Sequence, residues 1–108
     1  MYAREAGGSG NSQWQGTGTI HVYPSDGSFQ YIYNDYGGFT LSPAPRLTQG
    51  GVCFLEIHNG PLAGTISLTG WAKVNGSFDK TDGNIFMCRV SIDPFGQCAQ
   101  LNIDGMNF

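Results

Sequence analysis

Charged residues are scarce in this sequence. Aspartate, glutamate, lysine and arginine form 12% of its 108 residues, about half of the usual quarter. The five basic residues are scattered along the chain and the formal net charge is −3, so no basic stripe indicates a nucleic-acid partner. A surface with so few charges favours contact with other proteins as well as with water.

Long apolar runs are absent as well. No run approaches the roughly 18 residues that would indicate a transmembrane helix, so we expect no membrane partner. The opening residues, MYAREAGGSGNS, lack the apolar stretch of a secretory signal peptide. If Met1 is the native start, this pattern predicts synthesis and retention in a cytoplasm.

Helical periodicity is the third absence. No window repeats its apolar residues every ~3.6 positions between helix caps, whereas short runs rich in β-branched and aromatic residues lie between turn formers. About seven to nine strands fit this pattern, which predicts an all-β chain folded as an antiparallel β-sandwich or jelly-roll-like domain. The predicted strands include residues 17–23, 29–36, 52–58, 65–70, 85–92 and 98–103, with short extended pieces at 39–41 and 71–74.

The composition divides the chain into two regions. Residues 1–18 are rich in glycine, serine, glutamine and asparagine and poor in β-branched residues, which predicts a flexible N-terminal arm. Residues 19–108 are predicted to form a single β-sandwich domain, because the whole chain is long enough for one ordinary domain and too short for two. No segment repeats at a fixed period.

Alternation assigns side chains to the two faces of each strand. In residues 52–58 the alternation places Glu56 and His58 on one face and Cys53 on the other. In residues 29–36 one face carries Phe29, Tyr31 and Tyr33, and the other carries Gln30, Ile32 and Asn34.

Three cysteines limit the disulfides, since an odd number leaves at least one thiol unpaired within the chain. A hairpin loop at residues 93–96 would place Cys88 opposite Leu101 on the apolar face and Cys98 on the polar face. A bond between Cys88 and Cys98 is therefore disfavoured. We expect Cys53 and Cys88 to be buried free thiols, and Cys98 is a candidate for a disulfide with another chain.

Signatures of catalysis, metal binding and cofactor binding are missing. His21 and His58 are the only histidines, and no close cysteine or histidine pair indicates a zinc site. Asp79 and Asp82 supply oxygen atoms in FDKTDGN, but their spacing does not fit a calcium-binding EF-hand loop and favours a turn. No nucleophile-elbow, P-loop or dinucleotide motif occurs. We therefore predict no enzymatic activity, no metal and no cofactor.

Aromatic residues supply the candidate interaction surface. They form 13% of the chain, and aromatic side chains both anchor protein interfaces and stack on sugars. Trp14 either packs over the edge of its own domain or anchors the arm on a neighbour. The candidate interface residues are Trp14, Tyr31, Tyr33 and Trp71.

Short motifs between residues 37 and 103 resemble a small domain of virion proteins from tailed bacteriophages, particularly those that infect alphaproteobacteria. The motifs are GFTL at 38–41 with the Pro-rich loop after it, LEIHNG at 55–60, AGTI at 63–66, GSFD at 76–79 and TDGNIF at 81–86. The resemblance implies a β-sandwich used on the outside of capsids or in fibres, often as a trimer. It carries no catalytic residue.

The expected function is therefore structural. We predict a capsid decoration protein that is made in the host cytoplasm and carried in the virion. It is expected to form a homotrimer and to bind the major capsid protein or other virion proteins on the head surface. The alternatives are a tail- or collar-fibre module and a carbohydrate-binding β-sandwich module that takes a host-surface glycan; a small hydrolase is the least favoured.

Overall fold

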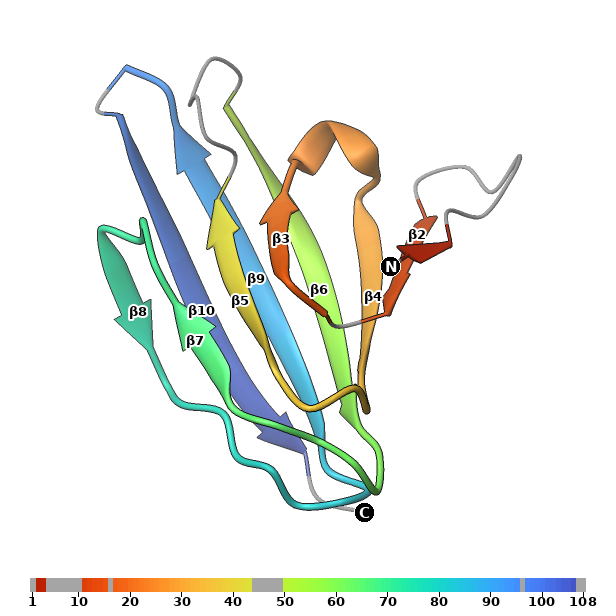
Figure 1. Ribbon diagram of the computed structural model, residues 1–108. Helices are drawn as coiled ribbons and strands as arrows, with labels where there is room; N and C mark the ends of the chain where they lie inside the picture. Colours follow the sequence, from red (N-terminus) through yellow and green to blue (C-terminus); the bar gives the residue numbers. More distant parts are fainter. Residues whose placement is uncertain (1, 4–10, 16, 44–49, 96, 107–108) are drawn as a thin grey trace.

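Two β-sheets organise the chain. The computed structural model describes residues 2–3, 11–15, 17–43, 50–95 and 97–106 (Figure 1). The prediction of an all-β chain is confirmed, because strands dominate and a single short 3₁₀ helix interrupts them in the described residues. The elements are β1 (Tyr2–Ala3), β2 (Asn11–Gln15), β3 (Thr19–Val22), η1 (Pro24–Asp26), β4 (Phe29–Asn34), β5 (Phe39–Pro43), β6 (Gly51–Asn59), β7 (Ile66–Leu68), β8 (Lys73–Asn75), β9 (Ile85–Asp93) and β10 (Cys98–Met106).

Strands alternate between the two sheets in the first part of the chain. The large sheet has the order β1-β2-β4-β6-β9-β10-β8, and the small sheet, in front of it in Figure 1, has the order β3-β5-β7. From β2 to β5, each strand pairs in parallel with the strand two positions later. The chain therefore forms three stacked coils, β2–β3, β4–β5 and β6–β7, as in a β-solenoid.

The coils differ in length, which explains why the sequence shows no repeat. Asn11 pairs with Phe29, and Phe29 pairs with Phe54, so one coil advances 18 residues and the next advances 25. Connections of unequal length take up the difference. A fixed period, which is the usual sequence signal of stacked repeats, cannot arise from such coils.

Antiparallel strands close the stack at its C-terminal side. β9 pairs with β6 and with β10 in antiparallel register, and β8 joins the far edge of β10 in parallel. These strands extend only the large sheet, so the connections that flank β8 help to cover their inner surface. Trp71 and Phe78 come from those connections and pack against the core.

The predicted antiparallel sandwich or jelly roll differs from this topology. Five of the eight strand pairings formed by the described residues are parallel. The turn signals predict hairpins, but connections such as residues 35–38 carry the chain from one sheet to the other. Parallel neighbours need such crossovers, and the alternation of side chains is the same in either pairing direction.

Two strands lie within the predicted flexible arm. Tyr2–Ala3 pairs with β2, and β2 pairs in parallel with β4 along its whole length, which sets Trp14 opposite Ile32. The large sheet thus runs across the boundary predicted at residue 18. Residues 2–3 and 11–15 of the predicted arm form strands, residues 1, 4–10 and 16 lie outside the described part, and the division of the chain at residue 18 stays a prediction.

One apolar cluster fills the space between the sheets. Alternation along the strands buries every second side chain, so β9 and β10 each present an apolar row to the small sheet and its connections. The cluster consists of Ile20, Val22, Ile32, Phe39, Leu41, Cys53, Leu55, Ile57, Phe86, Cys88, Val90, Ile92, Ala99, Leu101 and Ile103.

Buried asparagines join two successive coils. Asn34 is fully buried at the end of β4 and pairs in register with Asn59 of β6. Its amide nitrogen donates to the Asn59 side-chain oxygen and to the Gly64 carbonyl, both at 3.0 Å. Asn59 in turn donates to the carbonyls of Asp79 and Thr81 at 2.8 and 3.1 Å. This ladder satisfies backbone groups that the coil corners turn inward.

Glycines allow the corners of neighbouring coils to stack. The Gly64 backbone lies so close to Gly37 and Gly38 that a Cβ atom on Gly64 would overlap their backbone atoms. Gly38 adopts a φ of 108°, which glycine tolerates far better than other residues. The Phe39 amide then donates to the Thr65 carbonyl at 3.1 Å, so the two corners are hydrogen-bonded as well as packed.

The last hairpin turns one residue later than predicted. Asp93 pairs with Cys98 and Cys88 pairs with Ile103, so the predicted register is wrong by two residues. Gln97, in the loop, has a φ of 51°. A slip of two residues leaves every side chain on its predicted face, and Cys88 is buried while Cys98 is partly exposed.

Candidate functional site

Aromatic and apolar side chains gather on the outer face of the large sheet. We use "outer face" for the side chains of β4, β6 and β9 that point away from the core. Burial alternates along β4, β6 and β9, so one set of side chains packs inward and the other points outward. The outer face consists of Phe29, Tyr31, Tyr33, Val52, Phe54, Glu56, His58, Ile85, Met87, Arg89, Ser91 and Asp93.

Strand register aligns these side chains in rows across the sheet. Phe29 pairs with Phe54, and Phe54 pairs with Arg89 on the next strand. Directly opposed side chains in neighbouring strands stand about 5 Å apart, so each row is a continuous strip. The strip is well exposed, because Phe29 is 37% and Phe54 is 48% accessible to solvent.

A polar contact lies beside this strip. The Glu56 carboxylate contacts the His58 ring nitrogen Nε2, and the centroids of the His58 and Tyr31 rings lie 4.7 Å apart. Burial raises the pKa of the Tyr31 hydroxyl, and the charges of Glu56 and Tyr33 raise this pKa further. Tyr31 therefore keeps its proton at neutral pH and can donate a hydrogen bond to a ligand.

The predicted interface residues separate into three groups. Tyr31 and Tyr33 both lie on the outer face, where they are partly exposed. Trp71 lies in the connection between β7 and β8, packs against the core and donates from its indole nitrogen to the Leu41 carbonyl at 3.0 Å. Its role in the structure is to support the fold. The side chain of Trp14 lies outside the described part of the chain.

Sequence reasoning missed the contribution of β6 and β9 to this face. Alternation does place Val52 and Phe54 on the face opposite Cys53, and both are exposed, at 46% and 48%. Alternation along one strand does not show which strand lies beside it, because the alternation is the same in every arrangement of strands. Only the parallel register of β4 and β6 brings Phe54 beside Phe29.

Neither a metal centre nor a membrane helix is found within the described residues. No group of three or more histidine, cysteine, aspartate or glutamate side chains in this part of the chain lies close enough together to hold a metal ion. Likewise, none of the described segments forms a helix long and apolar enough to span a membrane. The property that distinguishes the outer face is its exposed apolar and aromatic side chains, which suit protein contact or ring stacking.

All three cysteines are free thiols in the structure, but they differ in accessibility. Cys53 and Cys88 are 0% and 1% exposed, and burial raises the pKa of each thiol to about 12. Cys98 is partly exposed at the start of β10. The proposed disulfide from Cys98 to another chain stays a prediction.

Alkylation should therefore distinguish the three thiols. Treatment of the native protein with iodoacetamide at pH 8 should add one label, at Cys98, because at a pKa of about 12 only ~1 in 10,000 thiols of Cys53 or Cys88 is ionised. Mass spectrometry of intact and digested protein gives the count and position. The Cys98→Ser variant should gain no label unless it is unfolded; rapid labelling of Cys53 in native protein would contradict the buried core.

No protein-family model matches this sequence, and neither the curated proteins nor the solved structures include a significant match. The resemblance to phage virion proteins therefore depends on the sequence motifs alone.

Proposed function

We propose that this chain is a structural assembly protein that uses the outer face to pack against other proteins, and that it serves as a capsid decoration protein of a bacteriophage. The observation that carries the assembly role is the exposure of Phe29, Val52 and Phe54, at 37%, 46% and 48%, on one face of the large sheet. Aromatic side chains at the centre of a surface are the usual anchors of protein interfaces.

The dimensions of the outer face support this role. Strands in a sheet lie about 4.8 Å apart and rise about 3.3 Å per residue, so the three strands of the outer face, of which β6 and β9 are the longest, span roughly 15 by 30 Å. A stable protein interface needs about 800 Å² of accessible surface from each partner. The outer face supplies a large part of that area, and β10, the next strand of the same sheet, extends the surface without any change in the fold.

The charges on the outer face are also compatible with burial. The Glu56 carboxylate contacts His58, and Arg89 and Asp93 are the other ionic side chains of the face. Desolvation of unpaired charge is a major cost of forming an interface. Ionic side chains are a minority on this face and are of both signs, so another protein can cover it where it supplies partners for Arg89 and Asp93.

The proposed position of this chain in a virion is based on the sequence resemblance. In this proposal the protein is made in the host cytoplasm, assembles as a homotrimer and contacts the major capsid protein or other virion proteins. A tail- or collar-fibre module is the closest alternative, and it differs in location only. Electron microscopy of intact particles that contain this chain should place it on the head surface; its absence there would exclude decoration.

Substitution of the exposed phenylalanines tests the assembly surface. The double change Phe29→Ser and Phe54→Ser should weaken self-association or capsid binding at least ~30-fold, since loss of interface anchors costs about 2 kcal/mol or more. Sedimentation over a concentration series and binding to decoration-free capsids measure this effect.

The matched control is Leu62→Ser. Leu62 is more exposed, at 69%, but it lies in the connection after β6 and not on the outer face. This variant should assemble as the native protein does. Equal assembly of the double phenylalanine variant and the native protein would show that the outer face is not the contact surface.

A carbohydrate-binding module is the second candidate, and the paired rings of Tyr31 and His58 favour it. Aromatic rings on a flat face can stack on sugar rings. Saturable binding on a glycan array, lost in Tyr31→Ala, would support this candidate. Trp71→Ala is a poor test because Trp71 packs against the core.

A further inference from the structure

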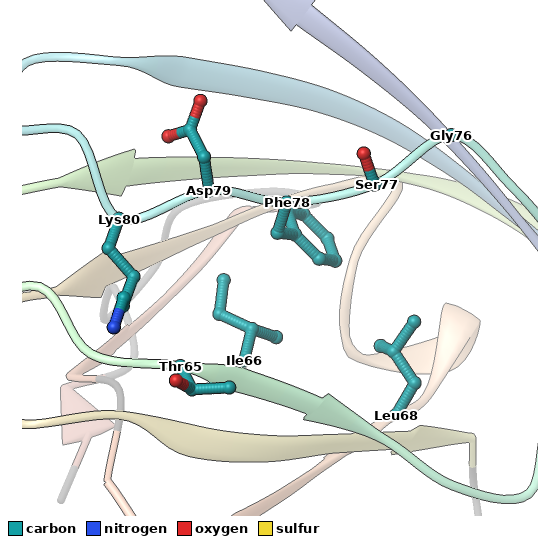
Figure 2. A pocket seen from close by; sticks show the side chains of 8 residues that line it. All are labelled: Thr65, Ile66, Leu68, Gly76, Ser77, Phe78, Asp79 and Lys80. Atoms are coloured by element: carbon teal, nitrogen blue, oxygen red, sulfur yellow. The ribbon is translucent and has the colours of Figure 1, made fainter.

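A groove runs along the free edge of the small sheet. It lies between β7 and the segment Gly76–Lys80 and has a volume of about 480 Å³. Figure 2 shows Ile66 of β7 and Phe78 of the facing segment pointing toward each other across it. Both side chains also pack against the core, so the floor of the groove is apolar and fixed in place. Leu68 extends this floor and is 37% exposed.

The backbone of β7 can accept another strand at this edge. β7 is the last strand of the small sheet and pairs only with β5 among the described strands. The Thr65 carbonyl and the Thr69 amide bond to β5. Backbone groups alternate in direction along a strand, so Ser67 also faces β5, whereas the N–H and C=O groups of Ile66 and Leu68 face the groove.

The positively charged side chain of Lys80 lies at one end of the groove. Lys80 extends its side chain toward Thr65, as Figure 2 shows, while the Asp79 carboxylate points the opposite way. That carboxylate is occupied, since it accepts from the Thr81 amide at 3.0 Å and from the Asn84 side chain at 2.8 Å. Among the described residues, Glu56 and His58 form an ion pair, and no carboxylate of this part of the chain pairs with Lys80.

We propose that this groove binds an extended peptide segment of another protein, with apolar side chains at alternate positions and an acidic end beside Lys80. The segment adds as a fourth strand to β7 and hydrogen-bonds to the backbone of Ile66 and Leu68. Its inward side chains contact Phe78. Addition of a strand to an open sheet edge is a common mode of peptide recognition, in which the backbone supplies affinity and the side chains supply selectivity. Attraction between Lys80 and the acidic end fixes the direction of the segment.

Fluorescence anisotropy with synthetic peptides tests this site. The probe is a fluorescein-labelled octapeptide of alternating valine and threonine that ends in two aspartates, and its counterpart ends in two lysines. The acidic probe should bind saturably and at least ~10-fold more tightly than the basic one. Lys80→Glu should reverse this preference, whereas Lys73→Glu, which changes an exposed lysine of β8, should leave it unchanged.

A second variant tests the backbone contacts. Leu68→Pro removes an N–H group that faces the groove and leaves the hydrogen bonds to β5 in place, so it should weaken binding of the acidic probe at least ~10-fold. Ser67→Ala, whose backbone faces β5, is the matched control and should bind normally. If Leu68→Pro does not fold, the exposed Lys80→Glu substitution still decides the proposal.

Three results would overturn the proposal. The first is no saturable binding of the acidic probe at millimolar concentration, and the second is equal binding of both probes to the native and Lys80→Glu proteins. The third is a dimer of the protein alone that Leu68→Pro dissociates and the acidic probe does not, which would assign the groove to a second copy. The Phe29→Ser and Phe54→Ser double variant should bind the acidic probe normally. A negative result for the outer face would therefore not affect the proposal for the groove, and the reverse also holds.

Discussion

Replacement of Gly64 by alanine should remove most of the stability of this protein. The added methyl group would overlap backbone atoms of Gly37 and Gly38, and backbone cannot move aside as a flexible side chain can. The corners of two coils would have to separate, which would also break the hydrogen bond from Phe39 to Thr65. We expect a loss of at least ~4 kcal/mol, against a typical total of about 5–15 kcal/mol for a folded domain.

Urea unfolding followed by circular dichroism measures this loss. Gly105→Ala is the matched control, because its methyl group would meet the Phe86 ring at 3.7 Å, an ordinary contact distance. That control should change stability by less than about 1 kcal/mol. If Gly64→Ala were as stable as Gly105→Ala, the corners of the coils would not be stacked as closely as described.

The Asn34→Asp substitution should produce the second large effect, and it should depend on pH. Asn34 is fully buried and its side-chain amide nitrogen donates to Asn59 and to the Gly64 carbonyl. Aspartate would place a carboxylate against those two acceptors. Loss of the donors and burial of an unpaired charge together should cost about 3–5 kcal/mol at pH 7.

The sign of the pH dependence follows from burial. Burial disfavours the charged form, so the pKa of an aspartate at position 34 would lie above its unfolded value of about 3.9. The unfolded state then releases a proton more readily than the folded state, and the variant loses stability as pH rises above that value. Lowering the pH from 7 toward 4 should therefore restore part of the lost stability.

Asn102→Asp provides the control for charge alone. Asn102 is partly exposed, and its side-chain oxygen accepts a hydrogen bond from Asn75 at 2.7 Å, which an aspartate oxygen can also do. This variant should stay within about 0.5 kcal/mol of the native protein. A similar loss for Asn102→Asp and Asn34→Asp would indicate that net charge, and not the buried ladder, determines the effect. Stability of Asn34→Asp that does not change between pH 4 and 7 would contradict the predicted burial of its carboxylate.

Strand positions could be predicted from this sequence because alternation is a local property. The predicted segments 29–36, 52–58 and 85–92 overlap β4, β6 and β9. Alternation does not tell which phase is buried, however. In β4 the general preference for buried aromatic residues would place Tyr31 and Tyr33 inside, whereas the structure buries Gln30 and Asn34, since their amides satisfy inward-facing backbone groups.

Strand pairing could not be predicted, and the candidate site depends on it. A turn signal such as Asn59-Gly60 is compatible with a hairpin and with a corner that crosses to the other sheet. The long-range contacts decide between them: the Gly60 amide donates to the Asn34 carbonyl at 2.9 Å, one coil earlier. Tyr31 and Tyr33 could be chosen as candidates from the sequence because they are aromatic, but their neighbours on β6 and β9 could not be predicted.

The order of the strands along the chain is the reverse of the order in which we expect the coils to fold. Among the described pairings the tightest connection joins β9 and β10, where Asp93 pairs with Cys98, while Phe29 must find Phe54 25 residues away. Short loops lose less chain entropy on closing, and parallel pairs with long crossovers form slowly. We therefore expect the C-terminal hairpin to form first, β6 to join it, and the coils to add toward the N-terminus. A ribosome releases the strands in the reverse order, so the early strands lack a template until β9 and β10 have been made.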